Sequence, residues 1–141
     1  MPPSVAETPG DNPPGMILAI TAESLYLVNL LLLPGVAFLI LLVLFFKHHR
    51  GTPPLALSHL EQTFSASLWG GVLLVVVNLF IILLGGYDGP YTWVIVILYF
   101  TICHSCLILL GMLGLAKAMS GKCFRYPLIG RTLPVACRSM L

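Results

Sequence analysis

The sequence has few charged residues. Only 9% of its 141 residues are Asp, Glu, Lys or Arg, whereas soluble domains carry roughly 25%. Hydrophobic residues make up 58%, and the mean hydropathy is +1.00. A soluble globular fold is therefore excluded over most of the chain, which has the length of one domain. The net charge of +2 is too small to indicate a nucleic-acid partner.

Patterns that indicate catalysis are missing too. The sequence contains no nucleophile–base pair, carboxylate pair, phosphate-binding loop or zinc spacing, and an enzyme needs such a constellation. We therefore expect a protein that is not an enzyme and has no cofactor. The N-terminal tail has no basic residue, so it does not match a signal peptide.

Basic residues are absent from the first 46 positions and from the link between the last two apolar stretches. A bilayer core takes about 20 apolar residues as a helix, and three stretches qualify, at about 25–46, 64–84 and 91–116. All Lys and Arg residues then lie on one side, which the positive-inside rule makes cytoplasmic. The sequence predicts an all-α, multi-pass membrane protein. It has three transmembrane helices, with the N-terminus outside and the C-terminus inside.

Two tails flank the predicted membrane domain of residues 21–119. Residues 1–20 form a Pro-rich tail that we expect to be disordered, with its last part along the interface. Residues 120–141 form a cytoplasmic tail that mixes aromatic and basic side chains. We expect this tail to lie on the membrane surface or to dock under the bundle. Its predicted headgroup ligands are Lys122, Arg125, Tyr126 and Arg131.

Pro34 and Gly35 lie in the middle of the first predicted span. Proline removes one helical hydrogen bond and leaves the Leu30 carbonyl without its partner. One interpretation is a hinge or a lined cavity. The other, which we favour, is a static kink packed on a neighbouring helix, because membrane helices tolerate such prolines.

Small residues recur at helical spacing in the other two spans. Ala66 and Gly70 are four apart in the second span, and Gly111 and Gly114 are three apart in the third. Small side chains let membrane helices approach closely. Both sets lie in the cytoplasmic halves, so they predict packing of the second span on the third. The alternative is that they face a partner subunit.

Polar residues predict two further contacts. Ser58 and Glu61 match a capping box, so the second helix is expected to begin near Ser58. Asn29 and Asn78 fall at similar depths in their spans and are expected to bond to each other.

His104 is the one ionisable side chain deep in a predicted span, and such residues are candidates for function. It could ligate haem or a metal, relay protons, or stay neutral and bond to a backbone carbonyl such as the one freed by Pro34. No other span supplies a second histidine for haem. The run from Cys103 to Cys106 is not a c-type haem attachment. We favour the structural interpretation.

Three more histidines, His48, His49 and His59, lie near one another on the predicted cytoplasmic side. They could bind a metal, but we favour solvated residues at the interface. Cys123 and Cys137 fall in the reducing cytoplasm on this topology, so we expect thiols.

The order of these features resembles a known family. A helix with a central Pro-Gly precedes a basic link, a His-x-x-Gln turn from His59 to Gln62, two spans, and a closing Tyr-Pro-Leu-Ile-Gly-Arg at 126–131. This order resembles small bacterial membrane proteins of unknown function related to the Tic-type import-channel component of chloroplasts. The family's usual asparagine six residues after the histidine is here Ser65. The resemblance covers about residues 25–133. It implies the fold, a location in a bacterial inner (cytoplasmic) membrane, and faintly a translocation role.

Three classes of function follow. We expect a non-catalytic accessory or scaffold subunit of a larger membrane complex. Its partners are the lipid bilayer and other integral membrane subunits or itself. The second class is a channel or translocation component, although the spans hold too little polar surface to line a pore unless several copies assemble. The third is a haem-binding redox protein that uses His104.

Overall fold

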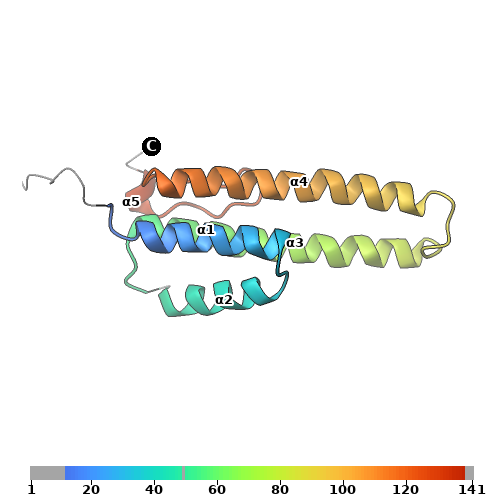
Figure 1. The fold of residues 1–141 in the computed structure, drawn as a ribbon, viewed down its shortest axis with the longest axis horizontal. Coiled ribbons are helices and arrows are strands. Elements are labelled where there is room, and N and C mark those ends of the chain that lie inside the picture. Colours follow the sequence, from blue (N-terminus) through green and yellow to red (C-terminus); the bar gives the residue numbers. More distant parts are fainter. Residues whose placement is uncertain (1–11, 49, 139–141) are drawn as a thin grey trace, which may run out of the picture.

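The computed structural model describes residues 12–48 and 50–138, which form helices and no strand. The helices are α1 (Met16–Leu31), α2 (Val36–His48), α3 (Pro54–Leu83), α4 (Thr92–Met119) and α5 (Val135–Arg138). Figure 1 shows a long hairpin of α3 and α4, with a short hairpin of α1 and α2 beside one half of it. Of the predicted tail, residues 1–11 lie outside the described residues, and residues 16–20 form the first turns of α1.

Two helices, α3 and α4, are long and apolar enough to cross a membrane. They have 30 and 28 residues and a mean hydropathy of 2.4 over their most apolar windows. At about 1.5 Å per residue, each exceeds the roughly 30 Å of a hydrocarbon core. The turn between them carries exposed Tyr91 and is followed by exposed Trp93, residue types that favour the membrane–water interface. The prediction of an all-helical fold is therefore confirmed, and two of its helices are candidates to span a membrane.

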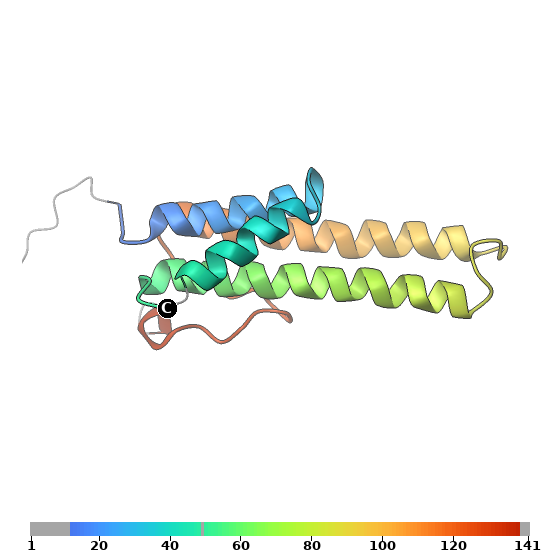
Figure 2. The same ribbon diagram turned by 90° about the horizontal axis from the view of Figure 1, so that it is seen from below.

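The first predicted span is not one helix. The helix α1 ends at Leu31 and α2 begins at Val36, and Figures 1 and 2 show that the two run in opposite directions. Pro34 has no N–H to donate to the Leu30 carbonyl, which weakens a helix at this point. Gly35 adopts φ +86°, which suits glycine, and its amide donates to Asn29 Oδ1 at 2.9 Å. The predicted kink is thus a full reversal of the chain.

This reversal changes the topology that the sequence suggested. With 16 and 13 residues, α1 and α2 are about 24 and 20 Å long, short of the roughly 30 Å hydrocarbon core. The start of α1, the link from α2 to α3, and the C-terminal residues all lie at the same end of the bundle (Figure 1). We call it the basic end, because Lys47, Arg50 and Lys117 lie there.

The start of α3 also differs from its prediction. The helix begins at Pro54 rather than near Ser58, because proline suits the first helical position, where its missing N–H loses no hydrogen bond. Ser58 lies inside the helix, and its hydroxyl donates to Leu55 O at 2.8 Å. The predicted capping box is therefore wrong.

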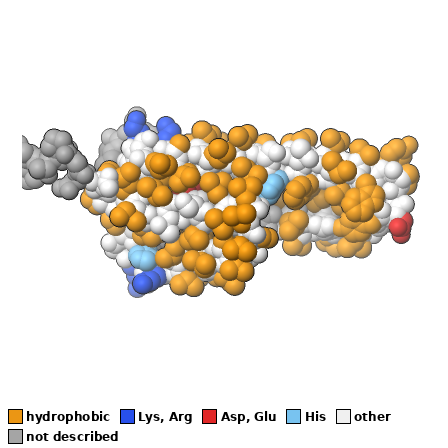
Figure 3. Space-filling model, in the orientation of Figure 1, with side chains coloured by type: hydrophobic (Ala, Val, Ile, Leu, Met, Phe, Trp, Pro, Cys, Tyr) orange, Lys and Arg blue, Asp and Glu red, His pale blue; other side chains and the backbone are white. Residues whose placement is uncertain are grey.

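The core lies in the basic half of the molecule, where α1 packs against both α3 and α4. Its buried residues include Ala22, Leu41 and Leu60 in one cluster and Tyr26 with Ala66 in another. Beyond the tip of the short hairpin, α3 and α4 run on as a pair whose apolar side chains are largely exposed. Figure 3 shows hydrophobic side chains over most of the visible face.

The small residues of α4 pack closely, but against α1 rather than α3. A Cβ on Gly111 would lie 2.7 Å from side-chain atoms of Tyr26 and Leu27, and a Cβ on Gly114 would lie 2.5 Å from Glu23 Oε2. In contrast, a Cβ on Gly70 would meet only Leu107, at an ordinary 3.5 Å. The predicted neighbour is therefore wrong for Gly111 and Gly114, because the short hairpin brings α1 onto α4, whereas Gly70 does face α4.

Candidate functional site

Three fully buried polar side chains meet at the basic end. Glu23 comes from α1, His59 from α3 and Tyr126 from the C-terminal strap, which we define as residues 122–137. The Nδ1 atom of His59 lies 2.6 Å from Glu23 Oε1. The Tyr126 hydroxyl donates to Glu23 Oε2 at 2.5 Å. One carboxyl group therefore joins two helices and the strap.

A backbone carbonyl determines the protonation of His59 Nε2, the ring nitrogen that faces away from Glu23. Nε2 lies 3.0 Å from the carbonyl oxygen of Lys122, and a carbonyl only accepts hydrogen bonds, so Nε2 carries a proton. Two arrangements then remain on the near side. Either a neutral His59 accepts a hydrogen bond at Nδ1 from a protonated Glu23, or a His59 imidazolium donates one to a Glu23 carboxylate. In both, the pair shares one proton and has no net charge.

Burial favours the neutral forms of these groups. It raises the pKa of Glu23 above the usual glutamate value, and the hydrogen bonds from His59 and Tyr126 and the charge of His59 offset this only in part. Burial also raises the pKa of Tyr126, and the neighbouring Glu23 raises it further. Burial therefore shifts both Glu23 and Tyr126 toward their protonated forms.

A second set of contacts fixes the strap along α3. The side chain of Gln62 donates to Arg131 O at 2.9 Å and accepts from the Tyr126 amide at 3.3 Å. Ser65 donates to Ile129 O at 2.9 Å. A Cβ on Gly130 would lie 2.4 Å from Gln62 Oε1, so only glycine fits there. The His-x-x-Gln turn and the Tyr-Pro-Leu-Ile-Gly-Arg run thus bind each other directly.

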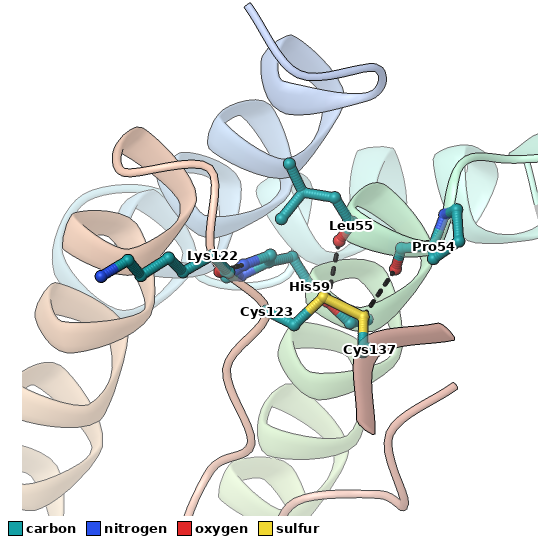
Figure 4. The surroundings of a disulfide bond; sticks show 7 residues. Pro54, Leu55, His59, Lys122, Cys123 and Cys137 are labelled. Atoms are coloured by element: carbon teal, nitrogen blue, oxygen red, sulfur yellow. Dashed lines mark hydrogen bonds between the residues drawn. A yellow bond between two sulfur atoms is a disulfide. The ribbon is translucent and has the colours of Figure 1, made fainter. Parts of the chain in front are cut away.

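A disulfide joins the two ends of the strap, so the prediction of thiols at Cys123 and Cys137 is wrong. Their Cα atoms are 5.9 Å apart. The strap runs out along α3 and returns to α5, which brings Cys137 back beside Cys123 and next to Pro54 (Figures 2 and 4). The prediction of thiols rested on the expected compartment and could not account for this return of the chain.

The predicted headgroup ligands separate into two kinds. Lys122, Arg125 and Arg131 are exposed on the strap, where they can meet lipid headgroups or solvent. Tyr126 is fully buried against Glu23, so its assignment to the headgroups is wrong. The strap docks on the bundle, which was the alternative that the sequence left open.

His104 lies in α4, away from the cluster. Its imidazole is half-buried and stacks on Phe100 with the ring centroids 4.7 Å apart. Within the part of the chain that the structure describes, it makes no hydrogen bond. The predicted bond to a carbonyl freed by Pro34 is therefore absent.

The expected pairing of the two membrane asparagines is also absent. Asn29 accepts from the Gly35 amide. Asn78 donates to Leu74 O at 2.7 Å and accepts from the Tyr87 hydroxyl. Each amide therefore holds its own end of a helix.

The histidines of the basic end do not form a group. His48 Nδ1 donates to Leu44 O at 3.2 Å, His59 belongs to the buried cluster, and His49 lies outside the described residues. Among residues 12–48 and 50–138, no three His, Cys, Asp or Glu side chains come together as metal ligands would.

Sequence reasoning used Glu23 only to orient the chain and took His59 for a solvated residue. One signal could have found the cluster. Glu23 is the single charged residue in the apolar run 16–33, and a buried carboxyl group needs a hydrogen-bonding partner. The three-span topology hid that partner, because it placed Glu23 and His59 on opposite faces of the membrane.

No protein-family model, curated protein or solved structure matches this chain. The likeness to Tic-related bacterial proteins therefore stays a prediction from short patterns. The case for function rests on the chain's own geometry.

Proposed function

We propose that this chain is a non-catalytic integral membrane protein that serves as an accessory or scaffold subunit of a larger membrane assembly. One observation carries the proposal. Thr101 and Ser105 are exposed one turn apart on α4, and neither hydroxyl has a hydrogen-bond partner within the described residues. Polar side chains in membrane helices bond across helices, so this face suits a neighbouring helix.

The buried cluster supports a structural role rather than a reactive one. Both ring nitrogens of His59 and both carboxyl oxygens of Glu23 are engaged in hydrogen bonds. Two apolar hollows exist elsewhere, one beside the start of α1 and one between the outer halves of α3 and α4. Neither hollow is lined by Glu23, His59 or Tyr126, whose side chains are fully buried.

We propose that the basic end faces the cytoplasm of a bacterial inner membrane. Support comes from the Lys and Arg residues at this end and from Asp88 in the turn at the other. The antiparallel course of α1 and α2 supports two spans plus a re-entrant hairpin in place of three spans. The two termini then lie on the same side of the membrane.

The test is purification of a tagged chain in mild detergent, followed by native mass spectrometry and an absorption spectrum. We expect an assembly larger than one chain. Thr101→Leu combined with Ser105→Leu should dissociate it. Ser120→Ala is the matched control, because the hydroxyl of Ser120 is also exposed but bonds to Ala116 O within the chain.

An assembly that the double variant leaves unchanged would remove this face from the proposal. A chain that is monomeric both in detergent and after cross-linking in membranes would refute the scaffold role. A Soret band that disappears in His104→Gln would indicate a haem protein instead.

A further inference from the structure

The strap carries two of the contacts that close the buried pair. Lys122 supplies the carbonyl that accepts from His59, and Tyr126 supplies the hydroxyl that donates to Glu23. Figure 4 shows the disulfide between Cys123 and Cys137 beside His59 and the first turn of α3. Cys123 follows Lys122 directly in the chain. The disulfide that closes the strap is therefore next to the backbone carbonyl that binds the Glu23–His59 pair.

We propose that the Cys123–Cys137 disulfide is a reversible latch, whose reduction loosens the strap and opens the Glu23–His59 pair to water. The inference rests on the cytoplasmic orientation proposed above. Disulfides in a reducing compartment are usually transient and redox-sensing, so a disulfide at this place is one that the cell makes and breaks.

The reductant is a dithiol of the thioredoxin class. Its thiolate attacks the sulfur of Cys123, because Cys123 is half-buried whereas Cys137 is fully buried. The S–S bond breaks, and Cys137 leaves as a thiolate that takes up a proton. The second thiol of the reductant then attacks the mixed disulfide and releases Cys123 as a thiol. Two electrons and two protons pass to the protein, and the reductant becomes a disulfide.

Reduction changes the equilibrium between the docked strap and a strap that has moved away from α3. The disulfide closes a loop with a sequence separation of 14, and a loop of about this size restricts the undocked chain by roughly 100-fold on the chain-entropy scale. The reduced strap also has a docked state. Cys137 Sγ lies 3.5 Å from Pro54 O, where a thiol can donate but a disulfide sulfur cannot. Reduction of the latch therefore raises the undocked population of the strap without abolishing docking.

The first test uses purified chain in which Cys103→Ser and Cys106→Ser leave only the strap cysteines. We compare the oxidised and dithiothreitol-reduced forms by tryptic cleavage at Arg131 and by carbethoxylation of His59. Both rates should rise on reduction, by about 10- to 100-fold, as the open population grows. Modification of His104, which lies outside the cluster, should not change.

Cys123→Ser combined with Cys137→Ser is the matched variant. It should show the fast rates with and without reductant. If this variant does not accumulate, reduction and reoxidation of the oxidised chain give the same comparison in one sample. Equal rates for His59 in the oxidised and reduced forms would overturn the latch.

The second test measures the thiols in cells by acid quenching and alkylation with a mass-adding maleimide. A mixture of dithiol and disulfide that shifts with added oxidant or reductant supports the proposal. A chain that stays fully oxidised under reductant overturns it. Neither test involves the Thr101 and Ser105 face, so failure of the latch and failure of the scaffold role are separate results.

Discussion

His59 Nδ1 lies 2.6 Å from Glu23 Oε1, although 36 residues separate the two along the chain. The pair exists because the chain reverses at Pro34 and Gly35, which brings α1 and the start of α3 to the same end of the bundle. Tyr126 then adds the strap to the same carboxyl group. The buried Glu23 side chain thus joins segments that are up to 103 residues apart in the sequence.

Substitution of Glu23 should reveal how much this junction stabilises the fold. Glu23→Leu leaves the Tyr126 hydroxyl and His59 Nδ1 buried without partners, at about 1–3 kcal/mol each. Glu23→Gln can accept from Tyr126 and donate to a neutral His59, so its loss should be smaller. Thermal unfolding in one detergent gives the comparison. Equal losses in both variants would mean that the hydrogen bonds contribute little.

The dependence of stability on pH should follow the raised pKa of Glu23. The folded chain keeps its proton where the unfolded chain has lost it. The stabilisation is therefore complete below the usual glutamate pKa and is lost as pH rises through the raised value. The effect is at most about 1.4 kcal/mol per pH unit. Unfolding midpoints of the native chain should fall over this range relative to Glu23→Gln, and parallel curves would contradict the assignment.

The two long helices could be predicted from hydropathy because each contains an 18-residue window with a mean hydropathy of 2.4, as a helix that crosses a bilayer would. The hairpin could not, because an apolar run of 22 residues from 25 to 46 satisfies the same rule whether or not it is continuous. Whether the run forms one helix or a hairpin depends on the left-handed conformation of Gly35 and on the hydrogen bond that Asn29 accepts from the Gly35 amide. Both are local features that a hydropathy profile does not record.

Sequence reasoning missed the candidate site because it missed the hairpin of α1 and α2. Sequence patterns did single out His59, Gln62 and the run 126–131, and the structure shows that these segments bind one another. Their contact is long-range, so neither spacing nor periodicity could reveal it. The disulfide was missed for the same reason, because its two cysteines meet only after the strap has returned along α3.

Gly114 should tolerate no side chain. A Cβ there would overlap the Glu23 carboxyl group, so Gly114→Ala should destabilise the fold by about 1–3 kcal/mol through overpacking. Gly70→Ala is the matched control, since its Cβ would make an ordinary contact and alanine favours the helix by up to about 1 kcal/mol. The two unfolding midpoints should move apart. A neutral Gly114→Ala would mean that α1 does not lie against α4 there.

The last prediction concerns topology and separates the hairpin from a third span. In a chain whose native cysteines are replaced by serine, single probes are introduced as Asn12→Cys, Gly89→Cys and Arg138→Cys. The start of α1 and the end of α5 lie at the basic end, and Gly89 lies in the turn at the other (Figure 1). An impermeant maleimide added to intact cells should therefore label the probe at Gly89 and spare the other two. Permeabilised cells provide the control, in which all three should react. Labelling of the Asn12 probe from outside would restore three spans. It would also place Glu23 near the opposite face from His59, which the 2.6 Å contact between them does not allow.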